Sequence, residues 1–171
     1  MEKNRTLVYA TCAQLKVKPN ELEEKIHTQV DEIKALKRSI ETFKARETAG
    51  ETERFLYGAN SIGGLRVITA SVPNADAGKL RQMGDLLRDK EAGVVAVLST
   101  VNGDKVTFLA VCGKDAVAKG VKAGDLVKLV CTACGGSGGG KPDSAMGGGK
   151  DVTKVDNALA LVDDFVATKI N

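Results

Sequence analysis

The sequence predicts an α+β (α/β) protein in which an N-terminal helical arm with a long heptad helix precedes a small globular domain, whose sheet of at least three strands is packed by helices. Three observations support this prediction. Apolar residues recur at heptad spacing early in the chain, their period later becomes that of strands, and an Asn-Gly pair separates two apolar runs. We therefore expect the arm over residues 1–60 and the globular domain over residues 61–171.

The composition is typical of a folded protein that is neither secreted nor inserted in a membrane. The chain is 43% hydrophobic, and its 25 Lys and Arg nearly balance its 22 Asp and Glu, for a net charge of +3. No apolar run approaches the roughly 18 residues of a membrane helix, and the first residues lack the pattern of a signal peptide. We therefore expect a cytoplasmic protein without membrane contact. Only 4% of the residues are aromatic, so any nucleic-acid contact should use cations and backbone rather than stacked rings.

The strongest periodic signal is a heptad seam in residues 20–46. Successive seam positions are separated by alternating steps of four and three residues, and only Gln29 interrupts the apolar series. This predicts one long helix that opens near Pro19 and ends before Gly58, preceded by a shorter helix over residues 7–15. The seam could pair two copies of the chain or fold back within one, so a monomer and a homodimer both remain open. The candidate dimerisation residues are Leu22, Ile26, Ile33, Leu36, Ile40 and Phe43.

Three strands are predicted in the globular domain. Residues 65–72 form an apolar, β-branched run, and residues 94–100 and 105–112 flank Asn102-Gly103. Because both residues of this pair tolerate positive φ, a type I′ turn should join the last two strands into a hairpin.

Helical patterns lie between and after these strands. Helices are expected over residues 75–91, 115–118 and 125–134, and a final helix over residues 153–170 should open at Thr153 as its N-cap. The buried face of the final helix should comprise Val155, Leu159, Val162, Val166 and Ile170.

The most unusual segment is GGSGGGKPDSAMGGGK, residues 135–150, which holds eight of the 19 glycines. We expect a loop between the last two helices in which backbone N–H groups converge on an anion, with Lys141 and Lys150 adding positive charge. The alternative is a glycine-rich helix connection that binds nothing. The candidate nucleic-acid-binding residues are Gly138, Gly139, Gly140, Lys141, Pro142, Asp143, Ser144, Gly147, Gly148, Gly149 and Lys150.

A nucleotide-binding P-loop is a competing interpretation, because Gly135 to Lys141 fits its GxxxxGK start. The next position should be Ser or Thr to hold Mg²⁺, but Pro142 has neither a hydroxyl group nor an N–H. The segment also lies too late in the chain for the remaining strands of that fold. The dinucleotide pattern GxGxxG fits in no register. We therefore expect no nucleotide-binding site in this segment.

The four cysteines include one Cys-x-x-Cys pair, Cys131 and Cys134, but a metal or redox role is disfavoured. A zinc site needs four ligands, and the single histidine, His27, lies far away in the long helix. A redox pair normally opens a helix, whereas this pair ends a helical pattern. We expect reduced, structural thiols and no metal ligand.

The segment GGGKPDSAMGGGK, with the amphipathic stretch that follows it, resembles the signature of the DHHA1 domain, which usually reads GGGRPDMAxxGG in alanyl-tRNA synthetases. The order of elements over residues 5–171 is similar to that of the whole C-terminal, or C-Ala, domain of that family. Lys141 stands where Arg is usual, which keeps the charge but loses the planar fork that grips phosphate, and Ser144 replaces Met. The positions that match the motif are Gly138, Gly139, Gly140, Pro142, Asp143, Ala145 and Gly147 to Gly149.

This resemblance implies a non-catalytic domain that binds the outer corner, or elbow, of tRNA and supports aminoacylation and editing by a longer enzyme. The expected partner is tRNA, with tRNA-Ala as the natural choice, and DNA is the second candidate. The longer enzyme would use ATP, Mg²⁺ and Zn²⁺, whereas no cofactor is implied for this part. The alternatives are a general DNA- or RNA-binding module that has lost its preference for tRNA, and a structural dimerisation module.

Overall fold

The computed structural model describes residues 2–170 and divides into two compact units, the first ending at Arg46 and the second beginning at Glu47. The predicted boundary lies after residue 60, whereas the last turns of the long helix belong to the second unit. In these turns Glu51 forms an ion pair with Lys79, whose Nζ lies 3.0 Å from Glu51 Oε2. Residues 1 and 171, the outer ends of the two predicted domains, lie outside the described residues. Among the helices of residues 2–170, none combines the length and the apolar character that a membrane span requires.

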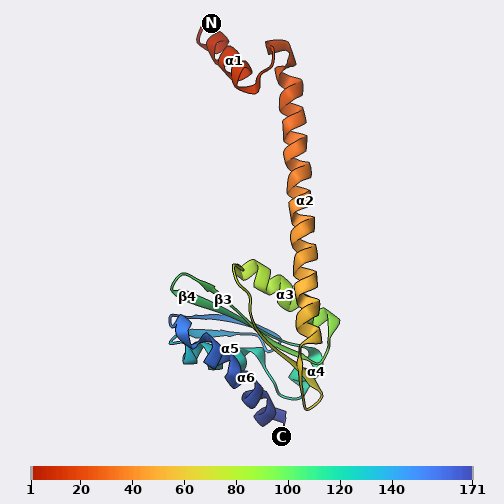
Figure 1. Cartoon of the computed structure of the whole chain (residues 1–171), viewed down its shortest axis with the longest axis vertical. Helices are drawn as coiled ribbons and strands as arrows, with labels where there is room; N and C mark the ends of the chain where they lie inside the picture. The colour runs from red at the N-terminus through yellow and green to blue at the C-terminus, as the bar shows by residue number, and fades with distance from the viewer. Residues whose placement is uncertain (1, 171) are drawn as a thin grey trace. The chain divides into compact units, whose positions relative to one another are not determined.

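The first unit contains helix α1 (Glu2–Leu15), a 3-10 turn (Pro19–Glu21) and most of helix α2 (Leu22–Tyr57), drawn in red and orange in Figure 1. Both predicted helices are confirmed, and α2 ends just before Gly58 as expected. The heptad seam of α2 is exposed to solvent: the exposed fractions of Leu36 and Phe43 are 62% and 71%. Within the described residues of the first unit, no other element covers this apolar stripe.

The second unit is built on a six-stranded mixed sheet with the strand order β1-β2-β3-β4-β6-β5. The neighbours β2 and β3 run parallel because α3 crosses between them, and the other four neighbouring pairs are antiparallel. The sheet thus contains the three predicted strands and three that were not predicted. The strands are β1 (Asn60–Ile62), β2 (Leu65–Ser71), β3 (Val94–Asn102), β4 (Lys105–Cys112), β5 (Ser137–Gly140) and β6 (Ser144–Gly149).

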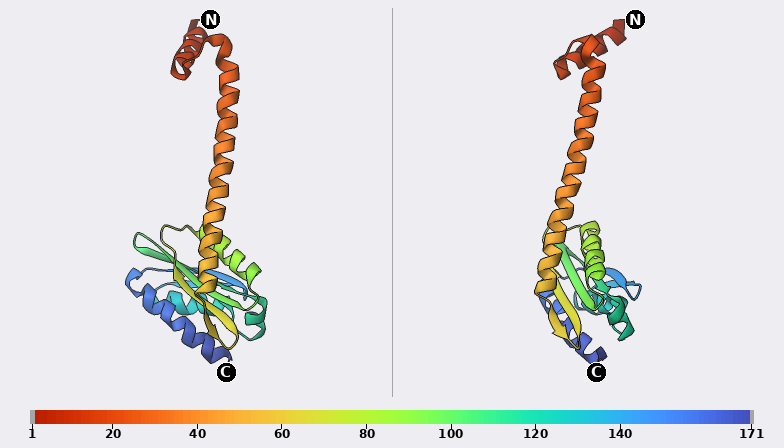
Figure 2. Two further views of the ribbon diagram at one scale, coloured as in Figure 1. Left: turned by 45° about the vertical axis from the view of Figure 1, so that its right-hand side comes forward. Right: turned by 90° about the vertical axis from the view of Figure 1, so that its right-hand side faces the viewer.

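Helices cover both faces of this sheet. Helix α3 (Ala77–Lys90) lies on one face, while α5 (Ala123–Ala133) and α6 (Val155–Ile170) lie on the other, as Figures 1 and 2 show. A short helix, α4 (Lys114–Ala118), follows β4. The central strand β3 is buried on both sides, since Val95 and Val97 join the α5–α6 core and their neighbours join the α3 core.

The turn between β3 and β4 differs by one residue from the prediction. Asn102 pairs with Lys105 across the ladder, so Gly103 and Asp104 form the turn instead of Asn102 and Gly103. Gly103 has φ +61°, and Asp104 is not among the described residues with positive φ, which is the pattern of a type II′ turn. Asn102 remains in the strand because its side-chain amide donates to Ala75 O at 3.2 Å.

The final helix begins at Val155, two residues later than predicted, because a 3-10 turn (Val152–Lys154) precedes it. Asp151, rather than Thr153, is the cap, and it caps this turn: its Oδ1 accepts from the Thr153 N–H at 3.1 Å and from the Thr153 hydroxyl at 2.6 Å. The side-chain hydrogen bond from Thr153 is the main reason that the pKa of Asp151 is lowered. The predicted face of α6 is confirmed, because Val155, Leu159, Val162 and Val166 are buried and Ile170 packs beside them, partly buried.

The largest correction concerns the glycine segment, which is a β-hairpin and not a loop. Residues 137–140 and 144–149 form β5 and β6, with β6 bonded to β4 and β5 at the edge of the sheet. Of the glycines in this segment, Gly135 alone has positive φ, at +64°, and it ends α5. The other seven adopt ordinary backbone conformations, so their amides do not converge on a point as the loop prediction requires.

Candidate nucleic-acid interface

One face of the β5–β6 hairpin packs tightly against α5. A Cβ atom placed on Gly147 would lie 2.6 Å from Cys131 Sγ, and one placed on Gly149 would lie 2.5 Å from Cys134 Cβ. Gly138 faces Val127 in the same way. These distances are far below van der Waals contact, so α5 can approach the hairpin only because these positions lack side chains. On this face glycine serves packing.

The opposite face of the hairpin, toward α3, is open. Nothing lies within 4 Å of a Cβ atom placed on Gly139, and the single close neighbour of one placed on Gly148 is Val106 O at 3.1 Å. The backbone of Gly139 and Gly140 helps to line a groove of about 610 Å³ between α3 and the hairpin. Met146 lies in the same groove, where its Sδ accepts from Arg81 Nε–H at 3.0 Å.

The turn that joins β5 to β6 is held by three backbone hydrogen bonds. The N–H of Lys141 donates to Ser144 O at 2.9 Å, the N–H of Ala123 donates to Pro142 O at 2.8 Å, and the N–H of Cys112 donates to Asp143 O at 3.0 Å. Pro142 suits this turn because its nitrogen has no hydrogen that needs an acceptor. The turn is therefore fixed to both β4 and α5, and it presents Lys141 from a preorganised backbone.

Arg88 links this turn to α3. Its Nη1 donates to Asp143 Oδ2 and its Nη2 donates to Asp85 Oδ1, both at 2.9 Å. Arg81 lies on the same face of α3, two helical turns earlier. Neither arginine was among the predicted binding residues. Their seven-residue spacing shows in the sequence that they share one helix face, but only the fold brings that face beside the turn. Together with Lys141 they make three cations in one groove, beside the carboxylates of Asp85 and Asp143.

The two lysines of the glycine segment do not act together. Lys141 lies in the turn, whereas Lys150 follows β6 at its far end, where its N–H donates to Cys134 O at 2.9 Å. Six strand residues lie between them, which corresponds to about 20 Å. The predicted binding residues therefore separate into groups. Those that line the groove are Gly139, Gly140, Lys141, Asp143 and Ser144.

The remaining predicted residues lie elsewhere on the hairpin. Gly138, Gly147 and Gly149 face α5, Gly148 is on the open face beyond the groove, and Pro142 is fixed in the turn. The polar and charged side chains of the segment that line the groove therefore lie at or beside the β5–β6 turn.

The thiols near the hairpin are free and buried, as expected for structural cysteines. Burial raises the pKa of Cys112 to about 12, with a further contribution from the nearby Asp143 carboxylate. Burial likewise raises the pKa of Cys131 to about 11. These side chains are neutral at physiological pH, and no group of three potential metal ligands occurs within residues 2–170.

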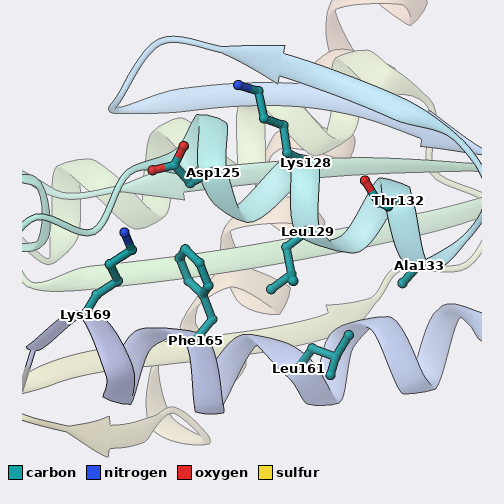
Figure 3. A pocket seen from close by; sticks show the side chains of 8 residues that line it. All are labelled: Asp125, Lys128, Leu129, Thr132, Ala133, Leu161, Phe165 and Lys169. Atoms are coloured by element: carbon teal, nitrogen blue, oxygen red, sulfur yellow. The ribbon is translucent and has the colours of Figure 1, made fainter.

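A second groove, of about 640 Å³, lies between α5 and α6. Figure 3 shows Leu129 of α5 facing Leu161 and Phe165 of α6, with Lys128 pointing away from this apolar floor. The ammonium of Lys169 lies 5.5 Å from the centre of the Phe165 ring. The lining of this second groove, between α5 and α6, is mainly hydrocarbon. It therefore suits a polyanion less well than the groove beside α3 does.

Comparison with known proteins supports the sequence resemblance. The profile of the DHHA1 domain family matches residues 64–168, more than half of the chain. The alanine–tRNA ligase of Alkaliphilus oremlandii is 36% identical over 171 residues, and that of Geobacillus thermodenitrificans is 39% identical over 166 residues. These alignments cover 100% and 97% of this chain but 19% of each ligase, so the chain spans about a fifth of the length of these relatives.

A solved structure shows the same fold. The C-Ala domain from Aquifex aeolicus alanyl-tRNA synthetase superposes with a TM-score of 0.60 and is 26% identical in sequence. The match covers 64% of this chain and 97% of that domain. The architecture of helices around a six-stranded mixed sheet is therefore the C-Ala fold, which confirms the fold class predicted from the sequence.

Proposed function

Because the chain belongs to the DHHA1 domain family, we propose that it is a non-catalytic tRNA-binding domain of a cytoplasmic alanine–tRNA ligase. In this proposal it grips the outer corner, or elbow, of tRNA, with tRNA-Ala as its partner, and supports aminoacylation and editing by the longer enzyme. The named relatives support this proposal because they are alanine–tRNA ligases aligned over nearly the whole chain.

The observation that carries the proposal is the groove between α3 and the open face of the β5–β6 hairpin. Arg81, Arg88 and Lys141 supply cations, and the glycine floor allows a ribose-phosphate backbone to approach the main chain. Arg88 is already shared between two carboxylates, and Arg81 Nε–H already donates to Met146 Sδ, whereas Lys141 has no ion pair with any described residue. Lys141 is therefore the cation most available to a phosphate.

This interface would bind RNA through charge and shape and perform no reaction. The neighbouring thiols are protonated because of their raised pKa values, so none is poised as a nucleophile. Binding through phosphate contacts should weaken steeply as salt rises. The ATP, Mg²⁺ and Zn²⁺ of the longer enzyme would be bound outside this part.

The test is an affinity titration with three competitors. Labelled tRNA-Ala bound to the chain is displaced by unlabelled tRNA-Ala, by the same tRNA with its elbow contacts disrupted, and by duplex DNA of equal length. We expect intact tRNA to compete best. If all three displace the probe equally, the protein is instead a general nucleic-acid-binding module and the tRNA proposal fails.

A second role, homodimerisation through α2, is favoured by the exposed heptad seam. Ile33 and Ile40 lie on that seam, and both are more than half exposed. We expect the mass measured by light scattering to approach twice 17.9 kDa at high concentration and to return to 17.9 kDa in the double variant Ile33→Glu, Ile40→Glu. A monomeric mass for the unmodified chain at all concentrations would reject this role.

A further inference from the structure

A second hollow adjoins the proposed RNA groove on the other side of the Arg88–Asp143 ion pair. It has a volume of about 670 Å³ and lies where α3 ends, β4 ends and α4 begins. Arg88 and Asp143 line both this hollow and the groove, so the two spaces share one wall. A ligand bound in the groove at Lys141 would therefore have the hollow directly beside it.

The lining of this hollow differs in chemistry from that of the groove. Asp89 and Asp143 offer acceptors, and Arg88 and Lys114 offer donors, so the formal charges cancel. The remaining walls are formed by Ala92, Cys112 and Val117. Burial raises the pKa of the Cys112 thiol to about 12, so this wall adds no negative charge at neutral pH. An uncharged ligand with both donors and acceptors fits this lining better than a second phosphate does.

We propose that the hollow is a nucleobase subsite, which takes one unstacked base of the bound RNA while the adjoining phosphate lies in the groove at Lys141. This inference rests on the proposed function and names the part of the RNA that is recognised. A base presents N–H donors and carbonyl or ring-nitrogen acceptors on one edge and apolar faces above and below. Asp89 and Asp143 can accept from the donors of the base, and Lys114 can donate to an acceptor.

The size of the hollow and its lack of aromatic residues support a base held by its edge. Ligand pockets of a few hundred Å³ enclose small organic groups, and a volume of about 670 Å³ accommodates a nucleoside. No Phe, Tyr or Trp lines the hollow, so recognition there would depend on hydrogen bonds rather than on stacking. Selectivity among the bases would then come from the two carboxylates, which reject a base edge that offers only acceptors.

The experiment compares a short single-stranded RNA with an abasic ribose-phosphate strand of the same length. Both are titrated against the unmodified chain, Asp89→Ala, Lys141→Gln and, as a matched control, Lys105→Gln, which lies at the opposite end of β4. Asp89 and Lys105 are exposed, so these changes should leave the fold intact. We expect the unmodified chain to bind the RNA about tenfold more tightly than the abasic strand, the effect of one hydrogen bond to a charged group, and Asp89→Ala to lose most of that difference.

The variants separate failure of this inference from failure of the proposed function. Lys141→Gln should weaken both strands equally and reduce the slope of log affinity against log salt by about 0.7, the value of one phosphate contact on a single strand. If the abasic strand binds as tightly as the RNA, or if Asp89→Ala keeps the full difference, the base subsite is overturned even though Lys141 still binds phosphate. If Lys141→Gln changes neither affinity nor slope, the proposed groove fails independently of the hollow.

Discussion

On the face of the β5–β6 hairpin that packs against α5, a Cβ atom placed on Gly147 would lie 2.6 Å from Cys131 Sγ, whereas on the opposite face nothing lies within 4 Å of one placed on Gly139. Both residues belong to the same motif and both have ordinary backbone conformations. The difference shows that a glycine motif can combine two roles: one face lets a helix pack closely, and the other leaves an open floor at which a ligand can approach the backbone. The two roles predict different effects of mutation.

The largest expected effect is on the packed face. Gly147→Ala forces the new methyl group against Cys131 and against the backbone of Gly138 and Ser137, and should destabilise the fold by about 3 kcal/mol. Gly139→Ala is the matched control and should change the free energy of unfolding by less than about 0.5 kcal/mol. Urea denaturation measures both. Equal losses from the two variants would remove the distinction between the faces.

Alkaline pH should lower the free energy of unfolding through Cys131, the buried thiol that packs against Gly147. The folded-state pKa of Cys131 is raised from an ordinary 9.0 to about 11, so the stability linked to its neutral form is complete below pH 9 and is lost as pH rises toward 11. The loss should be about 1 kcal/mol per pH unit in that window. Denaturation under reducing conditions at several pH values measures it, with Cys131→Ala as the reference. Between pH 9 and pH 11 the free energy of unfolding should fall more steeply with pH in the unmodified chain than in the Cys131→Ala reference. Parallel curves would disprove the link between the ionisation of Cys131 and stability.

The next largest effect is expected on tRNA binding at the open face. Reversing the charge of Lys141 places a carboxylate in the groove and should weaken tRNA binding about tenfold, whereas Lys150→Glu, at the far end of β6, should weaken it by less than about twofold. Gel-shift or filter-binding titrations at one fixed salt concentration compare the two. A larger loss from Lys150→Glu would move the interface to the other end of the hairpin.

The smallest expected effect concerns the ion pair between Arg88 and Asp143. The two side chains are 28% and 52% exposed, so solvent screens their attraction. Arg88→Ala should therefore lower the free energy of unfolding by less than about 1 kcal/mol, because backbone hydrogen bonds already hold the turn. Thermal or urea denaturation measures this. A loss above about 2 kcal/mol would mean that the ion pair, rather than the backbone, fixes the turn.

Much of the fold could be predicted because its local signals agree with its tertiary structure. The spacing of the seam residues predicts α2, and the apolar runs predict β2, β3 and β4 within a few residues. The final helix was predicted from Val155, Leu159, Val162 and Val166, all of which are buried. The predicted cap and turn were each displaced by one or two residues, because Asp151 and Asp104 take positions that a neighbouring residue could also fill.

The glycine hairpin could not be predicted from local propensity. Glycine disfavours strands, and residues 137–149 contain no β-branched or aromatic side chain. Pairing with β4 and packing under α5 create these strands, and both are long-range effects. The motif therefore identified the candidate region but not its geometry. Arg81 and Arg88 were missed for a related reason, since only the folded sheet brings α3 beside the turn.

The central claim is that RNA lies on the open face of the hairpin, and Gly139→Leu tests it most directly. This position has room for a side chain, so the variant should fold with a free energy of unfolding within about 1 kcal/mol of the unmodified chain. The leucine would fill the floor of the groove and should weaken tRNA binding by about tenfold or more in a titration at physiological salt. Unchanged affinity in the folded variant would contradict the claim and place the interface elsewhere on the domain.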